Sequence, residues 1–184
     1  MEILFATSNK HKFEEAKIVF AKFNITLIHY PFEYREIRSD SHEEIAKDSV
    51  TAAYKQCKKP VFVEDSGLSI DSLNGFPGTF SAWAFKKIGN VGILKLMSGT
   101  TKSNTRSATF VSSIAYHDGD KITTFVGMCE GTITEKLTGQ DGFGYDPIFI
   151  PQGEKLTFAQ SIELKNKLSH RYKVLLKFCE FLTN

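Results

Sequence analysis

Four short polar segments of this chain carry residue types that could bind a phosphorylated ligand and act on it. The most informative one runs from Gly142 to Pro147 and reads GFGYDP. Glycine lets the backbone come close to a ligand or take a positive φ, and proline pushes the residue before it toward an extended conformation. Flat rings beside backbone donors suit a nucleobase. The segment could equally be a tight structural turn. The segment carries two aromatic rings, Phe143 and Tyr145, and one carboxylate, Asp146.

A second segment, residues 7–12 with the sequence TSNKHK, lies where an expected strand ends and an expected helix begins. Backbone amides at a helix start attract phosphate, and the helix dipole adds to the attraction. Lys10 and Lys12 supply mobile positive charge. The simpler interpretation is that Ser8 or Asn9 only caps the helix. The chain has no GxxxxGK(S/T) pattern, which excludes a Walker phosphate loop.

Three acidic residues, Glu36, Glu64 and Asp65, form the third candidate group. Glu64 and Asp65 follow the apolar run 61–63, at the strand end where open α/β sheets place their ligands. Carboxylates that face a phosphate site commonly hold Mg²⁺, and a carboxylate beside such an ion can take a proton from an attacking water. The alternative is that these acids are solvated or paired with lysines.

The fourth segment contains Lys165, His170 and Arg171. Arg171 offers a planar fork of donors, and His170 can donate from either ring nitrogen. Both would suit a purine carbonyl or a phosphate, although an ordinary basic helix face explains them as well. A serine-hydrolase triad is disfavoured because Ser66 lacks the GxSxG turn, and the five histidines show no zinc-site spacing.

Short strands and amphipathic helices must position these segments. Hydrophobic periodicity and capping signals predict strands over 2–6, 25–29 and 61–63, and helices from about residue 10, from 41 to 57 and twice within 79–97. A hairpin is expected over 105–116 and 121–131, and residues 163–182 form either one kinked helix or two, with Ser169 as the second cap. This order indicates an α/β fold with a mixed, twisted sheet flanked by helices, and a ligand cleft between two lobes.

The bulk composition bounds the class of protein. A chain of 184 residues with 41% hydrophobic content is expected to form a single domain over 1–184, with two lobes. A net charge of +2 argues against a protein that coats nucleic acid. Three scattered cysteines predict buried thiols in a reducing compartment. The apolar stretch over residues 1–5 is too short for a signal peptide, and no apolar run approaches the roughly 20 residues of a membrane span. We therefore expect a cytoplasmic protein without nucleic-acid or membrane partners.

In their order along the chain, these segments resemble the inosine triphosphate pyrophosphatase family, the non-standard purine nucleoside triphosphate pyrophosphatases. The matching text is TSNxxK at 7–12, EDSGL at 64–68, GFPGxxSA at 75–82, GFGYDPIF at 142–149 and KNxxSHR at 165–171. Any one of these could occur by chance, but five in this order are specific, and they extend over nearly the whole chain.

The resemblance implies a fold, an assembly and a reaction. Members have an elongated α/β fold with a long mixed sheet and a cleft between lobes, and they are usually homodimers. They are Mg²⁺-dependent diphosphatases that hydrolyse ITP, dITP and XTP to the monophosphate and pyrophosphate, which removes deaminated purines from the nucleotide pool.

The resemblance also implies roles for individual residues. Glu36 and Asp65 would hold the magnesium ion, and Asp65 would be the general base that deprotonates water for attack on the α-phosphorus. Many members have glycine at the position of Ser8, and many have a substrate-facing lysine where our register places Ala52, so we assign no lysine from that helix. The implied substrate-binding residues are Thr7, Ser8, Asn9, Lys10, His11, Lys12, Ser66, Phe143, Gly144, Tyr145, Asp146, Lys165, His170 and Arg171, the last two at the base.

The base preference would follow from hydrogen-bond donors, because hypoxanthine and xanthine present a 6-carbonyl where adenine presents an amino group. Two other functions fit the same segments. One is a non-catalytic nucleotide-binding or sensor protein, which would have no use for the carboxylates at Glu64 and Asp65. The other is a related pyrophosphatase that acts on modified pyrimidine nucleotides.

Overall fold

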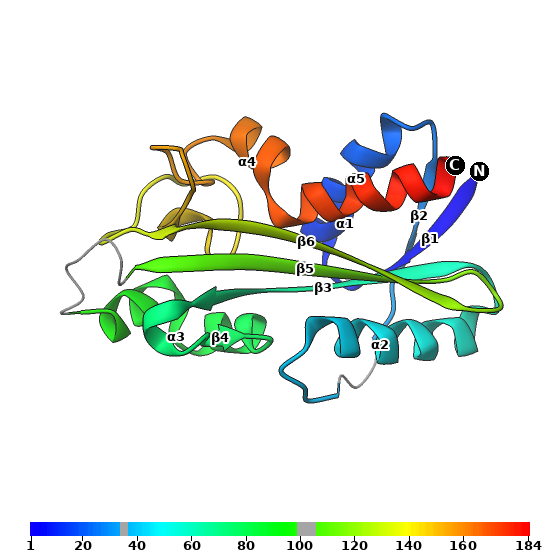
Figure 1. Ribbon diagram of the computed structural model, residues 1–184, viewed down its shortest axis with the longest axis horizontal. Coiled ribbons are helices and arrows are strands. Elements are labelled where there is room, and N and C mark those ends of the chain that lie inside the picture. Colours follow the sequence, from blue (N-terminus) through cyan, green and yellow to red (C-terminus); the bar gives the residue numbers. More distant parts are fainter. Residues whose placement is uncertain (34–36, 99–105) are drawn as a thin grey trace. The chain divides into compact units, whose positions relative to one another are not determined.

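The computed structural model describes residues 1–33, 37–98 and 106–184 (Figure 1). The chain divides into two compact units. Unit 1 comprises Met1–Asp65, Ser112–Gly127 and Arg171–Asn184, and unit 2 comprises Ser66–Val111 and Met128–His170. That the chain forms one domain, and that a cleft lies between two lobes, stay predictions.

Unit 1 is built on a sheet in which the strands follow the order β2-β1-β3-β5-β6. The central strand β1 (Glu2–Ala6) pairs in parallel with β2 (Thr26–Tyr30) and with β3 (Val61–Ile70). The strands β5 (Ser107–His117) and β6 (Ile122–Ile133) form the expected hairpin. The hairpin expected after the first three strands is therefore confirmed.

Helices cover both faces of this sheet (Figure 1). On one face lie α1 (Lys10–Ala21) and α5 (His170–Thr183), and on the other lies α2 (His42–Cys57). Side chains alternate between the faces of a strand. Accordingly, Phe5 and Phe62 pack with the α1 and α5 side chains in one apolar cluster, and Val61 and Val63 pack with the α2 side chains in another. Along β3, side chains therefore point alternately toward α2 and toward the face that α1 and α5 cover.

Unit 2 contains the remaining halves of β3, β5 and β6, together with β4 (Pro77–Gly78) and β7 (Phe149–Pro151). The strand β4 runs antiparallel to β3, and β7 runs antiparallel to β6, so the sheet is mixed as predicted. The helix α3 (Ser81–Leu96) lies on one face and α4 (Ile162–Leu168) on the other (Figure 1). The core between them is aromatic and aliphatic and includes Leu68, Ile70, Phe149 and Phe158.

Three local expectations are settled by the structure. The region 79–97 forms α3, which is broken at Gly89 (φ 58°, ψ −169°), in agreement with two short helices. Residues 163–182 form two helices, because Ser169 is extended (φ −63°, ψ 153°) between α4 and α5. The strand expected over 61–63 is longer than predicted and runs to Ile70. It continues because Leu68 and Ile70 are buried in the core of unit 2 and because the charge of Glu64 is paired.

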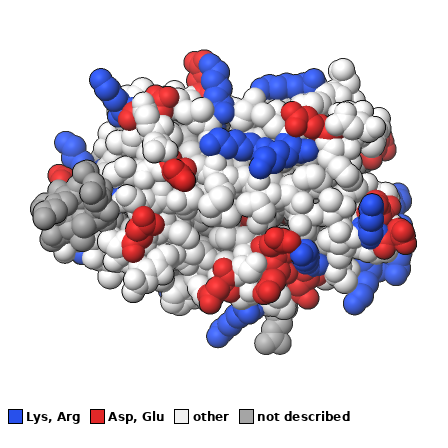
Figure 2. All heavy atoms as spheres, viewed as in Figure 1, with Lys and Arg blue, Asp and Glu red and all other residues white. Residues whose placement is uncertain are grey.

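Charge and cysteine placement agree largely with the composition. Lys and Arg side chains are interspersed with Asp and Glu over the face drawn in Figure 2. Cys129 and Cys179 are buried thiols as predicted, whereas Cys57 is only half-buried. None of the described helices has the length and apolar character needed to cross a bilayer.

Candidate functional site

The Thr7–Lys12 segment begins at the end of β1 and turns directly into α1. Asn9 is the N-cap, and its Oδ1 accepts hydrogen bonds from the amides of His11 (3.0 Å) and Lys12 (3.3 Å). The Thr7 hydroxyl accepts a bond from the Asn9 amide at 3.1 Å. The capping interpretation therefore holds for Asn9, and two of the amides at the helix start are bonded to it.

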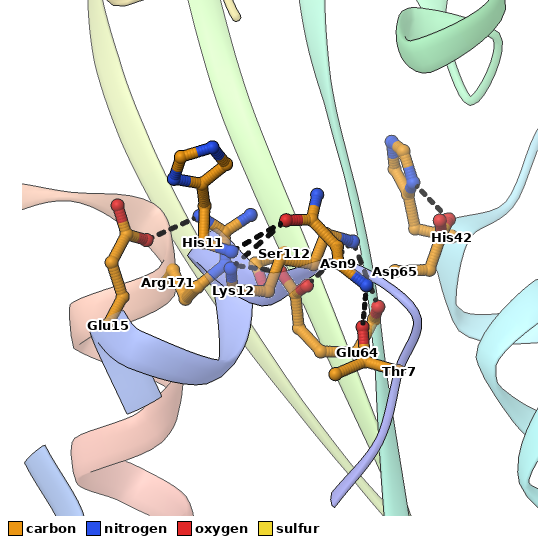
Figure 3. Close-up of polar contacts among 10 residues, drawn as sticks. All are labelled: Thr7, Asn9, His11, Lys12, Glu15, His42, Glu64, Asp65, Ser112 and Arg171. Atoms are coloured by element: carbon orange, nitrogen blue, oxygen red, sulfur yellow. Dashed lines mark hydrogen bonds and ion pairs between the residues drawn. The ribbon is translucent and has the colours of Figure 1, made fainter. Parts of the chain in front are cut away.

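Ser8, for which the resemblance implies a glycine in many members, causes no backbone strain. Among described non-glycine residues, a positive φ occurs at Asn24, Lys58 and Asn74, and Ser8 is not one of them. Ser8, Lys10 and His11 are exposed, and Lys12 is half-buried. The first turn of α1 thus offers exposed side chains together with one lysine that is directed into unit 1 (Figure 3).

Lys12 is held by Glu64, which is the centre of a buried polar cluster in unit 1 (Figure 3). The Lys12 ammonium lies 2.8 Å from Glu64 Oε2 and also donates to the Glu64 backbone carbonyl at 3.1 Å. Glu64 Oε1 accepts hydrogen bonds from Arg171 Nε, at 3.1 Å, and from the Ser112 hydroxyl. Arg171 forms a second ion pair with Glu15 at 2.6 Å. Oε1 is therefore hydrogen-bonded, and Oε2 is held in an ion pair with Lys12.

The cluster keeps Glu64 ionised although its side chain is completely buried. Burial by itself raises the pKa of Glu64, since it penalises the charged form. The charges of Arg171 and Lys12, with hydrogen bonds from Lys12 and Ser112, outweigh this effect and hold the pKa of the carboxyl well below its ordinary value. Glu64 is thus a fixed negative charge that anchors two cations.

Asp65, the next residue of β3, points to the opposite face of the sheet, as strand alternation requires. Its Oδ2 lies 2.6 Å from Nδ1 of His42, the first residue of α2 (Figure 3). An ionised carboxylate has only acceptors, so Nδ1 carries the hydrogen in this bond. The side chain of Asp65 is 17% exposed and that of His42 is 9% exposed. The acids were predicted as one group, but Glu64 and Asp65 have different partners on different faces.

The other metal-binding prediction, Glu36, lies outside the described residues. In the described part of the chain, no three His, Cys, Asp or Glu side chains are grouped so that they could hold a metal ion. Of the two adjacent acids of β3, Asp65 fits a cation ligand better than Glu64, because it is partly exposed and receives one hydrogen bond. Glu64 does not fit, because its two oxygens are bonded to Lys12, Arg171 and Ser112.

In unit 2 the GFGYDP segment is held from within by Asp146. Its Oδ2 accepts hydrogen bonds from the Phe143 amide at 2.7 Å and from the Lys165 ammonium at 2.6 Å. Gly142 has a φ of 76°, and a Cβ there would lie 2.3 Å from the same Asp146 oxygen, so glycine is required at this position. Asp146 and Lys165 are both buried. Their ion pair, together with the hydrogen bond from the Phe143 amide, fixes the backbone of this segment.

The two rings of this segment differ in exposure. Tyr145 is buried, its hydroxyl donates to the Ser81 carbonyl at 2.9 Å, and burial raises its pKa to about 12. Phe143 is half-buried, and the Lys165 ammonium lies 4.0 Å from its ring centroid, a cation–π contact. Asn90 of α3 donates to the Gly144 carbonyl at 3.0 Å. Phe143 is therefore the ring that can contact a ligand, and Tyr145 is an anchor.

The last predicted residues lie where the chain passes between the units. Ser66 is half-buried and begins the unit 2 part of β3. His170 is buried, and its ring stacks on Phe110 with centroids 4.5 Å apart. Arg171, its neighbour in sequence, belongs to unit 1 and joins the Glu64 cluster. Sequence reasoning missed Glu15, Ser112 and His42 as partners, and no local signal indicates them, because each meets its partner across a long stretch of chain.

The chain is similar to known proteins in both sequence and fold. Residues 3–181 match the model of the Ham1 family. A Methanopyrus kandleri protein named dITP/XTP pyrophosphatase is 47% identical, with 100% of this chain and 97% of the relative covered. A Saccharolobus solfataricus protein of the same name is 45% identical over 96% of this chain and 91% of its own length. The solved structure of the Staphylococcus aureus Ham1 protein superposes with a TM-score of 0.83 at 33% identity, covering 100% of this chain and 98% of that one. The predicted family resemblance and α/β fold are thereby confirmed.

Proposed function

This chain belongs to the Ham1 family, and from that premise we propose that it is a nucleoside triphosphate pyrophosphohydrolase. Its substrates would be dITP, XTP and ITP, which it would convert to the monophosphate and pyrophosphate. The names of relatives at up to 47% identity over the full chain support this choice. The main structural support for this function lies in unit 1. There Lys12, at the start of α1, forms an ion pair with Glu64, and the next residue of the strand is the partly exposed Asp65.

The triphosphate would be bound by the first turn of α1. Thr7, Ser8 and Asn9 lie at the positive end of the helix dipole, and Lys10 and His11 are exposed beside it. Lys12 would meet the charge of the leaving pyrophosphate. Its ion pair with Glu64 orients its ammonium group before substrate binds, which lowers the cost of reorganisation during reaction.

Asp65 would be the catalytic carboxylate. It would orient a water molecule in line with the α-phosphorus and take its proton as the phosphorus–oxygen bond to pyrophosphate breaks. Asp65 and Glu36 would hold Mg²⁺, which, when bound, neutralises phosphate charge as a Lewis acid. Asp65 fits both roles because its carboxylate is partly exposed, while the buried Glu64 on the other face serves as an anchor.

The base would be bound by unit 2 residues, with Phe143 as the stacking ring. The bonds from Asp146 and Asn90 fix the Phe143–Gly144 backbone, so the ring is presented by a rigid loop. His170, with Arg171, Ser66, Tyr145 and Lys165, would complete the substrate contacts implied by the family motif. Donors that match a 6-carbonyl would remain unpaired against adenine, and such sites discriminate by on the order of 10⁴.

A panel of nucleoside triphosphates tests this function directly. Purified protein would be incubated with dITP, XTP, ITP, ATP, GTP and modified pyrimidine triphosphates, with and without Mg²⁺, and the products separated. We expect monophosphate and pyrophosphate from dITP, XTP and ITP, and only when Mg²⁺ is present. Equal cleavage of ATP and ITP would contradict the donor-based selection. Preferential cleavage of pyrimidines would favour the related pyrophosphatase, and nucleotide binding without turnover would favour a sensor protein.

The assembly is proposed to be a homodimer in the cytoplasm. In unit 2, α3 leaves large apolar side chains exposed, among them Trp83 (59%) and Val91 (52%), and such side chains can supply the contact surface for a second copy of the chain. Analytical ultracentrifugation would measure the mass in solution, and Trp83→Glu is expected to weaken a dimer formed through this helix. A monomeric wild-type protein at micromolar concentration would contradict the proposal.

A further inference from the structure

His42 belongs to none of the five sequence motifs that mark the family resemblance. It is the first residue of α2, directly after Ser41, whose side chain caps the helix by accepting a bond from the Glu44 amide. The contact between His42 Nδ1 and Asp65 Oδ2, at 2.6 Å, joins residues that are 23 positions apart in the chain. Both residues belong to unit 1. The contact is therefore a property of the fold of this unit.

The direction of this hydrogen bond follows from the chemistry of the two groups. The carboxylate can only accept, so the imidazole donates through Nδ1–H. That hydrogen is present in the neutral Nδ1–H tautomer and also in the imidazolium, so the bond does not depend on the charge of the ring. Within the described part of the chain, this is the hydrogen bond that the Asp65 carboxylate receives. His42 therefore engages one of the two oxygens of the Asp65 carboxylate.

The same bond could merely attach α2 to the sheet. That attachment is already provided by apolar packing, because Ala46, Val50 and Ala53 of α2 are fully buried against Val61 and Val63. The bond also leaves Asp65 partly exposed rather than sealing it, which differs from the complete burial of Glu64. A largely buried donor beside a partly exposed carboxylate is the arrangement that orients a ligand or base.

We propose that His42 is a positioning residue for Asp65: its Nδ1–H binds Oδ2 and leaves Oδ1 to face the water or cation. This inference rests on the proposed function of Asp65. The orientation removes rotational freedom from the carboxylate before the reaction, so its loss would lower turnover more than substrate affinity.

Two substitutions of His42, one that keeps a hydrogen-bond donor and one that removes it, test the proposal when they are compared. Asn places an amide Nδ2 donor where the imidazole has Nδ1, whereas Leu has similar bulk and no donor. With XTP at saturating Mg²⁺, His42→Leu is expected to lower kcat by about 10–100-fold with little change in KM. His42→Asn is expected to recover most of that loss. Unchanged kcat in His42→Leu, or equal losses in the two variants, would overturn the proposal.

A second measurement does not depend on catalysis or on the metal. Long-range ¹H–¹⁵N NMR of the wild-type protein at neutral pH reports which ring nitrogen of His42 carries hydrogen. We expect Nδ1–H, and we expect the His42 signals to shift in Asp65→Ala, which removes the acceptor. A neutral ring protonated only at Nε2 would overturn the proposal. This readout remains available if the His42 variants fold poorly.

The failure of this inference can be told apart from the failure of the proposed function. If Asp65→Asn keeps wild-type turnover, Asp65 is not the catalytic carboxylate, and both proposals fall. If Asp65→Asn is inactive while His42→Leu is as active as wild type, only the positioning role falls. In the Asp65→Asn background, His42→Leu should cause no further loss, whereas a second loss as large as the first would show that His42 acts independently of Asp65.

Discussion

Glu64 and Asp65 are adjacent in sequence, yet the two faces of β3 treat them in opposite ways. Glu64 is completely buried and bonded to Lys12, Arg171 and Ser112. Asp65 is 17% exposed and receives one bond, from His42. A carboxylate whose oxygens are all bonded to protein cations is part of the scaffold, whereas one with a single donor and access to solvent can take part in chemistry. This difference predicts that substitution of Glu64 changes mainly the stability of the protein, and that substitution of Asp65 changes mainly its turnover.

The largest expected effect is on turnover. Asp65→Asn removes the base and a metal ligand but keeps an acceptor for His42, so kcat should fall by about 10³-fold. Stability to urea should change by less than about 1 kcal/mol, because the residue is partly exposed. Steady-state kinetics with XTP and urea unfolding would measure the two quantities. Near-wild-type activity of Asp65→Asn would show that Asp65 is not the catalytic carboxylate.

The second effect concerns the buried acid. Glu64→Gln keeps the shape of the side chain but leaves Lys12 and Arg171 without their shared countercharge. Removing one member of a buried ion pair typically costs about 3–5 kcal/mol, and we expect a loss near the lower end because Glu15 still pairs with Arg171. The free energy of unfolding from urea titration measures this.

A matched control for Glu64→Gln is Glu163→Gln. Glu163 also pairs with a lysine, Lys167, at 2.6 Å, but its side chain is 78% exposed. Solvent screens such pairs, so the urea midpoint should stay unchanged. If the two variants lost equal stability, burial would not be what distinguishes the Glu64 cluster.

The third effect is on pH dependence. The pKa of folded Glu64 is held below its ordinary value of 4.5, so its ion pairs stabilise the protein fully at neutral pH. As the pH falls below that value, the unfolded chain takes up the proton first, and the stabilisation is lost progressively. Urea unfolding between about pH 5 and pH 3 should show a steeper loss in wild type than in Glu64→Gln. Parallel curves would mean that another group causes the acid sensitivity.

The smallest effect tests the anchor in unit 2. Tyr145→Phe removes the bond to the Ser81 carbonyl and should cost about 1 kcal/mol in the free energy of unfolding. Tyr30→Phe is the control, since no bond to the Tyr30 hydroxyl is seen within the described residues. Urea unfolding of both variants measures the two free energies of unfolding, and only Tyr145→Phe is expected to lose stability. Equal stability of the two variants would show that the Tyr145 hydroxyl does not brace the loop.

The sequence predicted elements well where the signal is local. The capping box at Ser41 correctly located α2, and apolar periodicity located β1 and α1. The prediction of β3 ended too early, because the apolar run stops at residue 63 and the polar residues Glu64 to Ser66 follow it. The strand continues through these residues because distant cations neutralise Glu64, and such neutralisation leaves no local pattern.

The sequence alone determined which residue types are present at the phosphate, acid and base segments, and their motifs were enough to identify the family. The expected strand ended at residue 63, so the structure was needed to show that β3 continues through Glu64 and Asp65 and turns them to opposite faces. Only the tertiary structure decided what each acid meets: Arg171, 107 residues from Glu64, on one face, and His42 on the other. Local spacing sets the direction of a side chain, but the partner that neutralises or orients a charge depends on how distant segments pack.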